Sequence, residues 1–184
     1  MSSKHAIRPN TQKAIVEAAI QLLNNDAGAS MSEIALAAGV GRATLHRHFA
    51  NREALISEIQ LTCIEQMNAA VEAQIADAQS AAEQLQGLFA AAIPIGDRFN
   101  FLNLEADADP EVKRAYSAQL QRLFDLVSRL KTEGTLDENV PDHWVIAQID
   151  QLVWTAWREV SAGRLAALEA PALALRTLLR GLAV

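Results

Sequence analysis

The chain has few aromatic residues, a single cysteine and no long hydrophobic run. Aromatic side chains make up 5% of its 184 residues, and Cys63 is the only cysteine, so an internal disulfide is excluded. Cys63 lies in an apolar helical pattern, which favours a buried packing residue over a reactive thiol. No apolar stretch reaches the roughly 18 residues that a membrane helix needs, and no signal-peptide pattern opens the chain. We therefore expect a cytoplasmic protein.

Stretches rich in Val, Ile, Thr and Tyr are also scarce, which argues against β-sheet. Apolar residues recur instead at the spacing of an amphipathic helix, and 51% of the chain is hydrophobic. The sequence thus predicts an all-α fold. The expected helices cover residues 10–25, 31–38, 42–49, 52–77, 80–93, 98–106, 110–133, 141–163 and 169–182.

Charge is unevenly distributed along the chain. Residues 1–52 hold six Lys or Arg and three Asp or Glu, whereas the rest holds ten basic and nineteen acidic residues. A basic N-terminal part on an acidic remainder is typical of a chain in which only the first part meets a polyanion. Ordinary variation of surface charge is the alternative.

Two short helices joined by a tight turn are predicted inside the basic part. Ser30 and Glu33 have the spacing of a capping box, which begins a helix at Met31. Gly39 can adopt the left-handed conformation that ends this helix, and a second helix follows from Arg42. Such a pair is typical of a helix-turn-helix, whose second helix lies in a DNA major groove. A plain helical hairpin is the alternative.

A longer motif supports the DNA-binding interpretation. The run IALAAGVGRATLHRHFANREAL covers residues 34–55, and AIVEAAIQLL precedes it at residues 14–23. Residues 10–55 resemble the DNA-binding domain of the TetR family of bacterial regulators. Two positions depart from the family pattern: His46 stands where tyrosine is usual, and Gly41 where Ser or Thr caps the recognition helix.

The resemblance implies a three-helix DNA-binding domain over residues 1–52, with the helix-turn-helix at about 31–50. Arg42 is the best candidate for reading guanine in the major groove, and Thr44 for a thymine methyl group or a phosphate. The other candidates would position the protein on phosphates, although each could be a solvated surface residue. The complete set of candidate DNA-binding residues is Ser32, Arg42, Ala43, Thr44, His46, Arg47, His48 and Arg52.

Residues 53–184 are expected to form a helical domain for ligand binding and dimerisation. Asp150, Trp154 and Trp157 fall on one stripe of a predicted helix, and an acid among tryptophans suits a cationic or polar aromatic ligand. Simple core packing of both tryptophans is the alternative. The other candidate walls of such a pocket are Phe89, Phe99, Phe101 and Tyr116.

The last predicted helix carries a narrow leucine stripe. The resemblance implies that the last two helices pair with their two-fold mates in a four-helix bundle, and packing within one chain is the alternative. The candidate interface residues are Leu175, Leu178, Leu179 and Leu182.

No nucleophile with a base at motif spacing, no phosphate-binding loop and no metal signature is present, so we expect neither an enzyme nor a cofactor. His46 and His48 cannot share a metal ion, because residues two apart on a helix point in nearly opposite directions. The resulting hypothesis is a homodimeric regulator, typically a repressor, that binds a palindromic DNA operator and responds to an unknown small-molecule effector. The alternatives are an activator of the same fold and a helical ligand carrier that has lost DNA binding.

Overall fold

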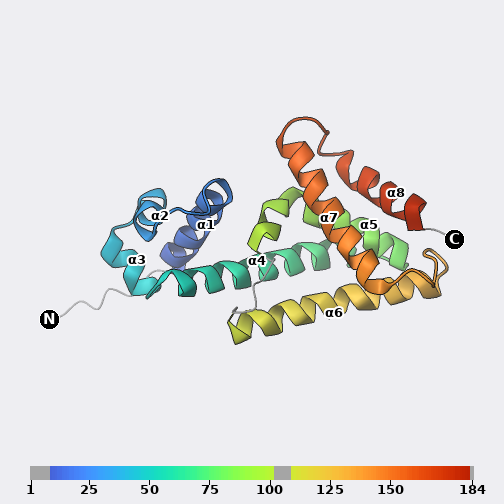
Figure 1. The fold of residues 1–184 in the computed structure, drawn as a ribbon, viewed down its shortest axis with the longest axis horizontal. Coiled ribbons are helices and arrows are strands. Elements are labelled where there is room, and N and C mark those ends of the chain that lie inside the picture. The colour runs from blue at the N-terminus through green and yellow to red at the C-terminus, as the bar shows by residue number, and fades with distance from the viewer. Residues whose placement is uncertain (1–8, 102–108, 183–184) are drawn as a thin grey trace. The chain divides into compact units, whose positions relative to one another are not determined.

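The computed structural model describes residues 9–101 and 109–182, apart from the side chains of residues 9, 10, 99–101 and 182 (Figure 1). Regular structure within these ranges is helical, which confirms the predicted all-α fold. The elements are α1 (Pro9–Asn25), α2 (Met31–Ala37), α3 (Arg42–His48), α4 (Arg52–Ile75), α5 (Ala81–Ala92), the 3₁₀ segment η1 (Ile93–Phe101), α6 (Pro110–Thr132), α7 (Asp142–Ser161) and α8 (Ala170–Leu182).

The chain forms two compact units, which we name the head (Met1–Thr62) and the body (Cys63–Val184). The division falls inside α4, farther along the chain than the boundary at residue 52 that the sequence predicts. Leu55 and Ile59, in the first half of α4, are fully buried. These apolar side chains give the beginning of α4 a place in the core of the head.

A small apolar core holds the head together. α1 contributes Ile15 and Ile20, α2 contributes Ile34, and α3 contributes Leu45, all with no exposed surface. The predicted capping box is present at the beginning of α2: the Ser30 hydroxyl accepts from the backbone N–H of Glu33, and the Ser30 N–H donates to the Glu33 carboxylate at 2.7 Å. The Ser30 N–H, and then the Ser30 hydroxyl, which donates to the same carboxylate at 2.7 Å, lower the pKa of Glu33.

The turn between α2 and α3 is a Schellman motif. Gly39 has a φ of +65°, its N–H donates to the Leu36 carbonyl at 3.0 Å, and the N–H of Val40 donates to the Ala35 carbonyl at 2.9 Å. A left-handed backbone favours glycine, and both hydrogen bonds use carbonyls that the ended helix leaves free. The predicted role of Gly39 is therefore confirmed, and the turn sets the direction in which α3 leaves.

The body is built around a larger core from α5, η1, α6, α7 and α8. Phe89, Leu130 and Ile149 are fully buried in it, and Cys63 is buried as well, as the sequence predicts. α7 packs against η1, α6 and α8, and α5 packs against η1, α6 and α8. The Glu133 carboxylate, at the end of α6, accepts from the first N–H of α5 at 2.9 Å, so it ties the two helices together.

One predicted element is wrong. The sequence predicts an α-helix over 98–106, but Ile93–Phe101 forms a 3₁₀ segment with a non-helical residue at Ile95, and residues 102–108 lie outside the described residues. Pro94 removes a backbone N–H from a regular helix here. Over the described ranges, no helix combines the length and the apolar character that crossing a membrane requires.

Candidate functional site

The second helix of the head, α3, presents its polar side chains on one face. Leu45 and Phe49 point into the core and anchor the helix, whereas Arg42, His46 and Arg47 are exposed. Exposed positions 42, 43, 46 and 47 follow one another at helical spacing, so they share a single outward face. We name Arg42, Ala43, His46 and Arg47 the recognition face.

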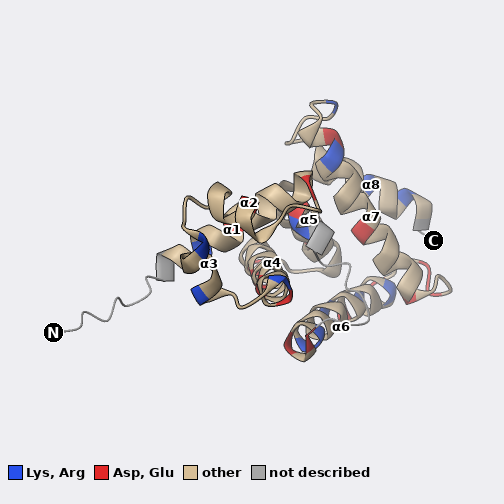
Figure 2. Ribbon diagram, turned by 60° about the vertical axis from the view of Figure 1, so that its left-hand side comes forward, with Lys and Arg blue, Asp and Glu red and all other residues tan. Residues whose placement is uncertain are grey.

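The recognition face is basic and sterically open. α3 carries two arginines and no acidic residue, and Figure 2 shows its blue segments without red between them. Ala43 adds only a methyl group, which leaves room for a close approach. Gly41 begins the helix without any side-chain cap, as its departure from the family pattern predicts. A basic, shallow helix face of this kind fits a DNA groove.

The remaining predicted DNA contacts are less exposed. Thr44 and His48 are half-buried, and the Arg47 guanidinium donates to the Thr44 hydroxyl at 2.9 Å, which draws Arg47 along the helix. Ser32 is half-buried in the first turn of α2, where Ser30 rather than Ser32 supplies the cap.

Arg52 differs from the others because the structure gives it partners inside the head. Its guanidinium donates to the carbonyls of Ala27, at 2.8 Å, and Ala29, in the loop between α1 and α2. Two of its nitrogens thus hold this loop to the beginning of α4, and the expectation that Arg52 also grips a DNA phosphate stays a prediction. The sequence did not reveal this contact, because the carbonyls belong to a loop more than twenty positions away.

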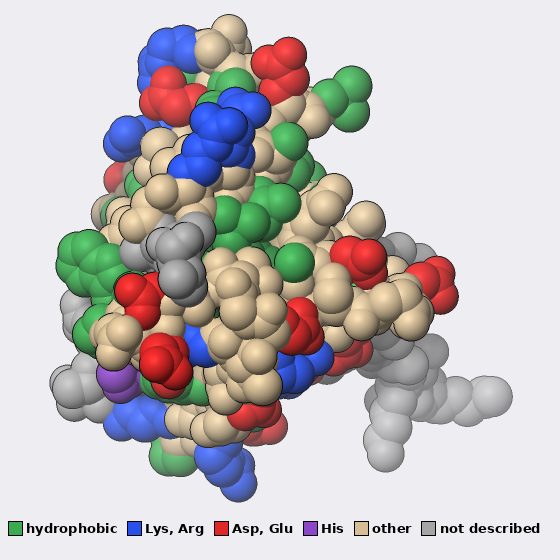
Figure 3. Space-filling view, turned by 90° about the vertical axis from the view of Figure 1, so that its right-hand side faces the viewer, with side chains coloured by type: hydrophobic (Ala, Val, Ile, Leu, Met, Phe, Trp, Pro, Cys, Tyr) green, Lys and Arg blue, Asp and Glu red, His purple; other side chains and the backbone are tan. Residues whose placement is uncertain are grey.

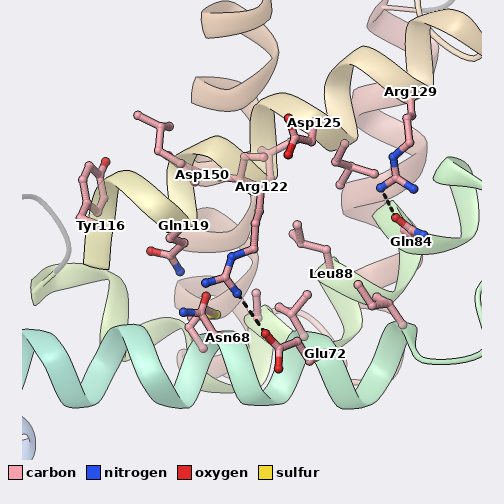
Figure 4. Close-up of a pocket in the computed structure, with 18 of the residues that line it drawn as sticks. Asn68, Glu72, Gln84, Leu88, Tyr116, Gln119, Arg122, Asp125, Arg129 and Asp150 are labelled. Atoms are coloured by element: carbon pink, nitrogen blue, oxygen red, sulfur yellow. Dashed lines mark hydrogen bonds and ion pairs between the residues drawn. The ribbon is translucent and has the colours of Figure 1, made fainter. Parts of the chain in front are cut away.

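The second candidate site is a cavity of about 710 Å³ inside the body, between α4, α5, α6 and α7 (Figure 4). Its volume is in the range of pockets that hold drug-sized ligands. Met67, Leu88 and Ile149 supply buried apolar walls. The predicted pocket residues Tyr116, Asp150 and Trp154 line it. Sequence analysis missed the polar walls from α4 and α6, among them Asn68, Glu72, Gln119 and Arg122.

Most of the charged side chains around the cavity have a hydrogen-bond partner. Arg122 forms an ion pair with Glu72 at 3.0 Å, Arg129 donates to Gln84, and Asp125 accepts from Gln121 at 3.0 Å. Asp150 has no hydrogen bond or ion pair among the described residues. Burial raises the pKa of Asp150 to about 6. Burial and then the charge of Asp150 raise the pKa of Tyr116.

Two of the predicted pocket residues lie elsewhere. Phe89 is fully buried in the core of the body and does not reach the cavity. Trp157 packs against Gly96 of η1, where an added Cβ would lie 2.4 Å from the Trp157 Cβ. The side chains of Phe99 and Phe101 lie outside the described residues. Of the seven predicted pocket residues, three therefore line the cavity, two pack the body instead, and two have side chains that are not described.

A chain of contacts runs from the cavity to α4. The rings of Trp154 and Trp157 lie 4.9 Å apart, so the cavity wall contacts the side chain that packs on Gly96. Two residues farther along η1, Arg98 donates to the Gln66 side chain of α4 at 3.1 Å. A displacement of Trp154 would therefore be transmitted to α4 through Trp157 and η1.

The predicted leucine interface is used at least in part inside one chain. Leu178 is 2% exposed and belongs to the core of its own chain, and Leu175 and Leu179 pack against that core. Leu182 has a side chain outside the described residues. Packing within one chain, the alternative, accounts for Leu178 and for the partial burial of Leu175 and Leu179, because α8 uses this stripe to cover α5 and α7.

These observations define the chain as a helix-turn-helix DNA-binding protein with a separate helical domain that contains a cavity. Residues 15–59 match the model of the bacterial regulatory proteins of the tetR family. These residues lie in the head, which is thus similar to the DNA-binding domain of the transcriptional regulators of this family.

Known proteins are similar to this chain beyond the head as well. It is 28% identical over 134 residues to the HTH-type transcriptional repressor LfrR of Mycolicibacterium smegmatis, covering 72% of this chain and 71% of that protein. A TetR family transcription regulator from Marinobacter aquaeolei VT8 has a similar fold, with a TM-score of 0.78 at 20% identity over 94% of this chain and 95% of the other. LfrR from Mycobacterium smegmatis, solved with proflavine, gives a TM-score of 0.74 at 22% identity over 95% and 98%.

Proposed function

We propose that the protein is a ligand-responsive repressor that acts as a homodimer on a palindromic operator. The recognition face carries this proposal, because exposed Arg42, His46 and Arg47 stand on a helix that Leu45 and Phe49 hold in place. Two such helices would enter successive major grooves, with centres about 34–36 Å apart. Arg42 would read a guanine, and His46, Arg47, His48 and Ser32 would position the head on phosphates. Such a protein works where the chromosome is, in the cytoplasm.

The first test is binding to a DNA duplex taken from upstream of the protein's own gene. Fluorescence anisotropy at several salt concentrations compares this duplex with a scrambled one. We expect sequence-dependent binding that Arg42→Ala weakens by about 1–3 kcal/mol and makes less selective. Arg114→Ala is the matched control, because it removes an exposed arginine from α6 in the body.

The outcomes separate the alternatives. Weak, steeply salt-dependent binding to both duplexes would mean that the phosphate contacts exist and the operator lies elsewhere. Absence of binding to any duplex at low salt would contradict the proposal and support a ligand carrier. An effect of Arg114→Ala equal to that of Arg42→Ala would also contradict it, because loss of charge alone would then explain both results.

The dimer interface is proposed on the outer face of α7 and α8 rather than on the leucine stripe. Trp144 of α7 and Leu173 of α8 are 56% and 38% exposed. Figure 3, which looks at the side of the molecule where α8 lies, shows hydrophobic side chains between groups of charged ones. Sedimentation should give a dimer that Leu173→Arg weakens and that Leu168→Arg, in the exposed loop before α8, leaves intact. A monomeric wild type would contradict this part of the proposal.

The cavity of the body is proposed as the effector site. LfrR, a repressor by name, was solved with proflavine, which supports a ligand-responsive body. Occupation of the cavity would move Trp154 and Trp157 and, through Gly96 and Arg98, displace α4. A coupling free energy of about 1–3 kcal/mol would change operator affinity 5–150-fold. Release of the bound operator by a small molecule tests this step, and unchanged anisotropy with the cavity occupied would contradict it.

A further inference from the structure

Among the acidic groups that line the cavity, Asp150 is the one that is both half-buried and without a partner among the described residues. Glu72 is paired with Arg122, and both are exposed at the rim. Asp150 comes from α7 and is half-buried, and none of the described residues gives it a hydrogen bond or an ion pair. Leaving a carboxylate in a poorly solvated place costs free energy that a positive ligand would recover.

The groups beside Asp150 are aromatic and neutral. Trp154 follows it by one helical turn on the same face of α7, and Tyr116 faces the cavity from α6 (Figure 4). Aromatic faces attract cations, best where water is excluded. Leu88 and Ile149 offer apolar surface for the rest of a ligand. One negative charge, two aromatic rings and apolar walls together suit a ligand that is both positively charged and largely apolar.

We propose that the cavity selects an organic cation with a flat aromatic body, whose positive charge is held by the Asp150 carboxylate beside Trp154 and Tyr116. This inference rests on the proposed function of the cavity as the effector site, and it adds the chemical class of the effector. A metal ion does not suit the site, because the described residues contain no group of three metal-ligating side chains. A neutral aromatic ligand would leave the buried carboxylate uncompensated.

The other charged side chains that line the cavity are Glu72, Arg122, Asp125 and Arg129, which have the partners given above. Elsewhere on α6, Lys131 forms an ion pair with Asp142 of α7, and Glu111, Lys113 and Arg114 are exposed. On η1, Asp97 and Arg98 form an ion pair at 2.8 Å. On α8, Arg176 and Arg180 are exposed. A change in cation affinity near pH 6 is therefore expected to follow Asp150, whose pKa burial raises to about 6.

The test uses three probes of nearly equal size and the full-length protein without DNA. N-methylacridinium has a permanent positive charge, 9-methylanthracene is its neutral analogue, and anthracene-9-carboxylate is negative. Binding is measured by quenching of tryptophan fluorescence and by calorimetry at pH 7.5. We expect N-methylacridinium to bind at least ten times more tightly than the other two. Its affinity should fall as the pH drops below about 6, because protonated Asp150 carries no charge.

Variants assign the effect to one carboxyl group. Asp150→Asn should weaken N-methylacridinium at least tenfold and abolish the pH dependence, whereas Asp150→Glu should keep a tighter affinity than Asp150→Asn. Asp77→Asn is the control, because it removes an exposed negative charge in the turn after α4, outside the cavity. A thermal melt shows that each variant is folded before binding is measured.

Several results would overturn the inference. Equal affinity for the cation and the neutral analogue, an unchanged affinity in Asp150→Asn, or binding of none of the probes would each exclude selection of an aromatic cation by Asp150. Operator binding without any probe is measured on the same preparations. If the operator binds but the cation is not selected, the inference fails and the DNA-binding function stands. If the cation binds but no DNA duplex does, the proposed function as a DNA-binding repressor is contradicted instead.

Discussion

The head presents its basic side chains on the outside of a seven-residue helix, whereas the body collects polar side chains around a hollow between four longer helices. A convex basic face suits a long polyanion, because many shallow contacts add up along the DNA backbone. A concave cavity suits a small ligand, because it can surround most of the ligand surface. The head thus offers a convex basic face, and the body offers a concave cavity that contains the acidic group of Asp150. A substitution in one of these sites leaves the residues of the other unchanged.

The largest expected effect is the loss of stability in the head alone, which tests whether the two units fold independently. Leu45→Ala removes a fully buried side chain that fixes α3 in the head, at an expected cost of about 2–5 kcal/mol. We expect loss of operator binding in anisotropy, while N-methylacridinium still quenches tryptophan fluorescence in the body. Leu36→Ala, at a position 81% exposed on α2, is the control and should change stability by less than about 0.5 kcal/mol. Loss of both activities in Leu45→Ala would show that the units do not fold independently.

The next effect concerns the contact between η1 and α7. Gly96→Ala would place a Cβ 2.4 Å from the Cβ of Trp157, an atom close to the backbone that cannot rotate away. We expect a loss of about 2–3 kcal/mol in the body, with an altered fluorescence spectrum of Trp154 and Trp157. Gly181→Ala is the control, since its added Cβ meets no atom within 4 Å. Equal melting temperatures for Gly96→Ala and wild type would contradict this packing.

The third effect depends on pH. Folding raises the pKa of Asp150 from its ordinary value of 3.8 to about 6, so the folded state holds this proton more tightly than the unfolded state. The contribution of this proton to the free energy of unfolding is complete below about pH 4, and it is lost as the pH rises through 6. Asp150→Asn should therefore be about 1–2 kcal/mol more stable than wild type at pH 7 in urea unfolding. The difference should shrink toward pH 4, and a constant difference would exclude this cause.

The smallest effect compares one helix cap in each unit. Ser30 caps α2 in the head and Ser80 caps α5 in the body, each accepting from the backbone N–H of a glutamate three residues later, at 3.3 and 3.2 Å. Each change to alanine should cost about 1 kcal/mol. Ser30→Ala should weaken operator binding and spare the affinity for N-methylacridinium, and Ser80→Ala should do the reverse. Hydrogen exchange at Glu33 and Glu83 would report each loss locally.

Most of the helices and the recognition face could be predicted because their signals are short in sequence. The capping box from Ser30 to Glu33, the left-handed Gly39 and the spacing of Leu45 and Phe49 all lie within a few residues of one another. Periodicity also located α4 to α8 to within a few residues. Local patterns of this kind specify an element and its outward face.

The cavity and the internal contacts could be predicted only in part, because they join residues far apart in the chain. Tyr116, Asp150 and Trp154 were suggested by their chemistry, but nothing near them in sequence indicates that Asn68 of α4 lines the same hollow. The same holds for Arg52, whose carbonyl partners lie in another loop. Helical periodicity tells that Leu178 faces an apolar surface, and it does not tell whether that surface belongs to the same chain.

The fastening of the loop between α1 and α2 to the beginning of α4 has a practical consequence for building chimeric regulators. Arg52 holds the carbonyls of this loop, and Gln12 of α1 donates to Glu58 of α4 at 2.9 Å. A head transplanted with only residues 1–52 would leave out Glu58 and the buried Ile59. A junction between Thr62 and Cys63 keeps these attachments in one piece. Biosensors that exchange DNA specificity among such proteins should therefore be spliced within the helix that both units share.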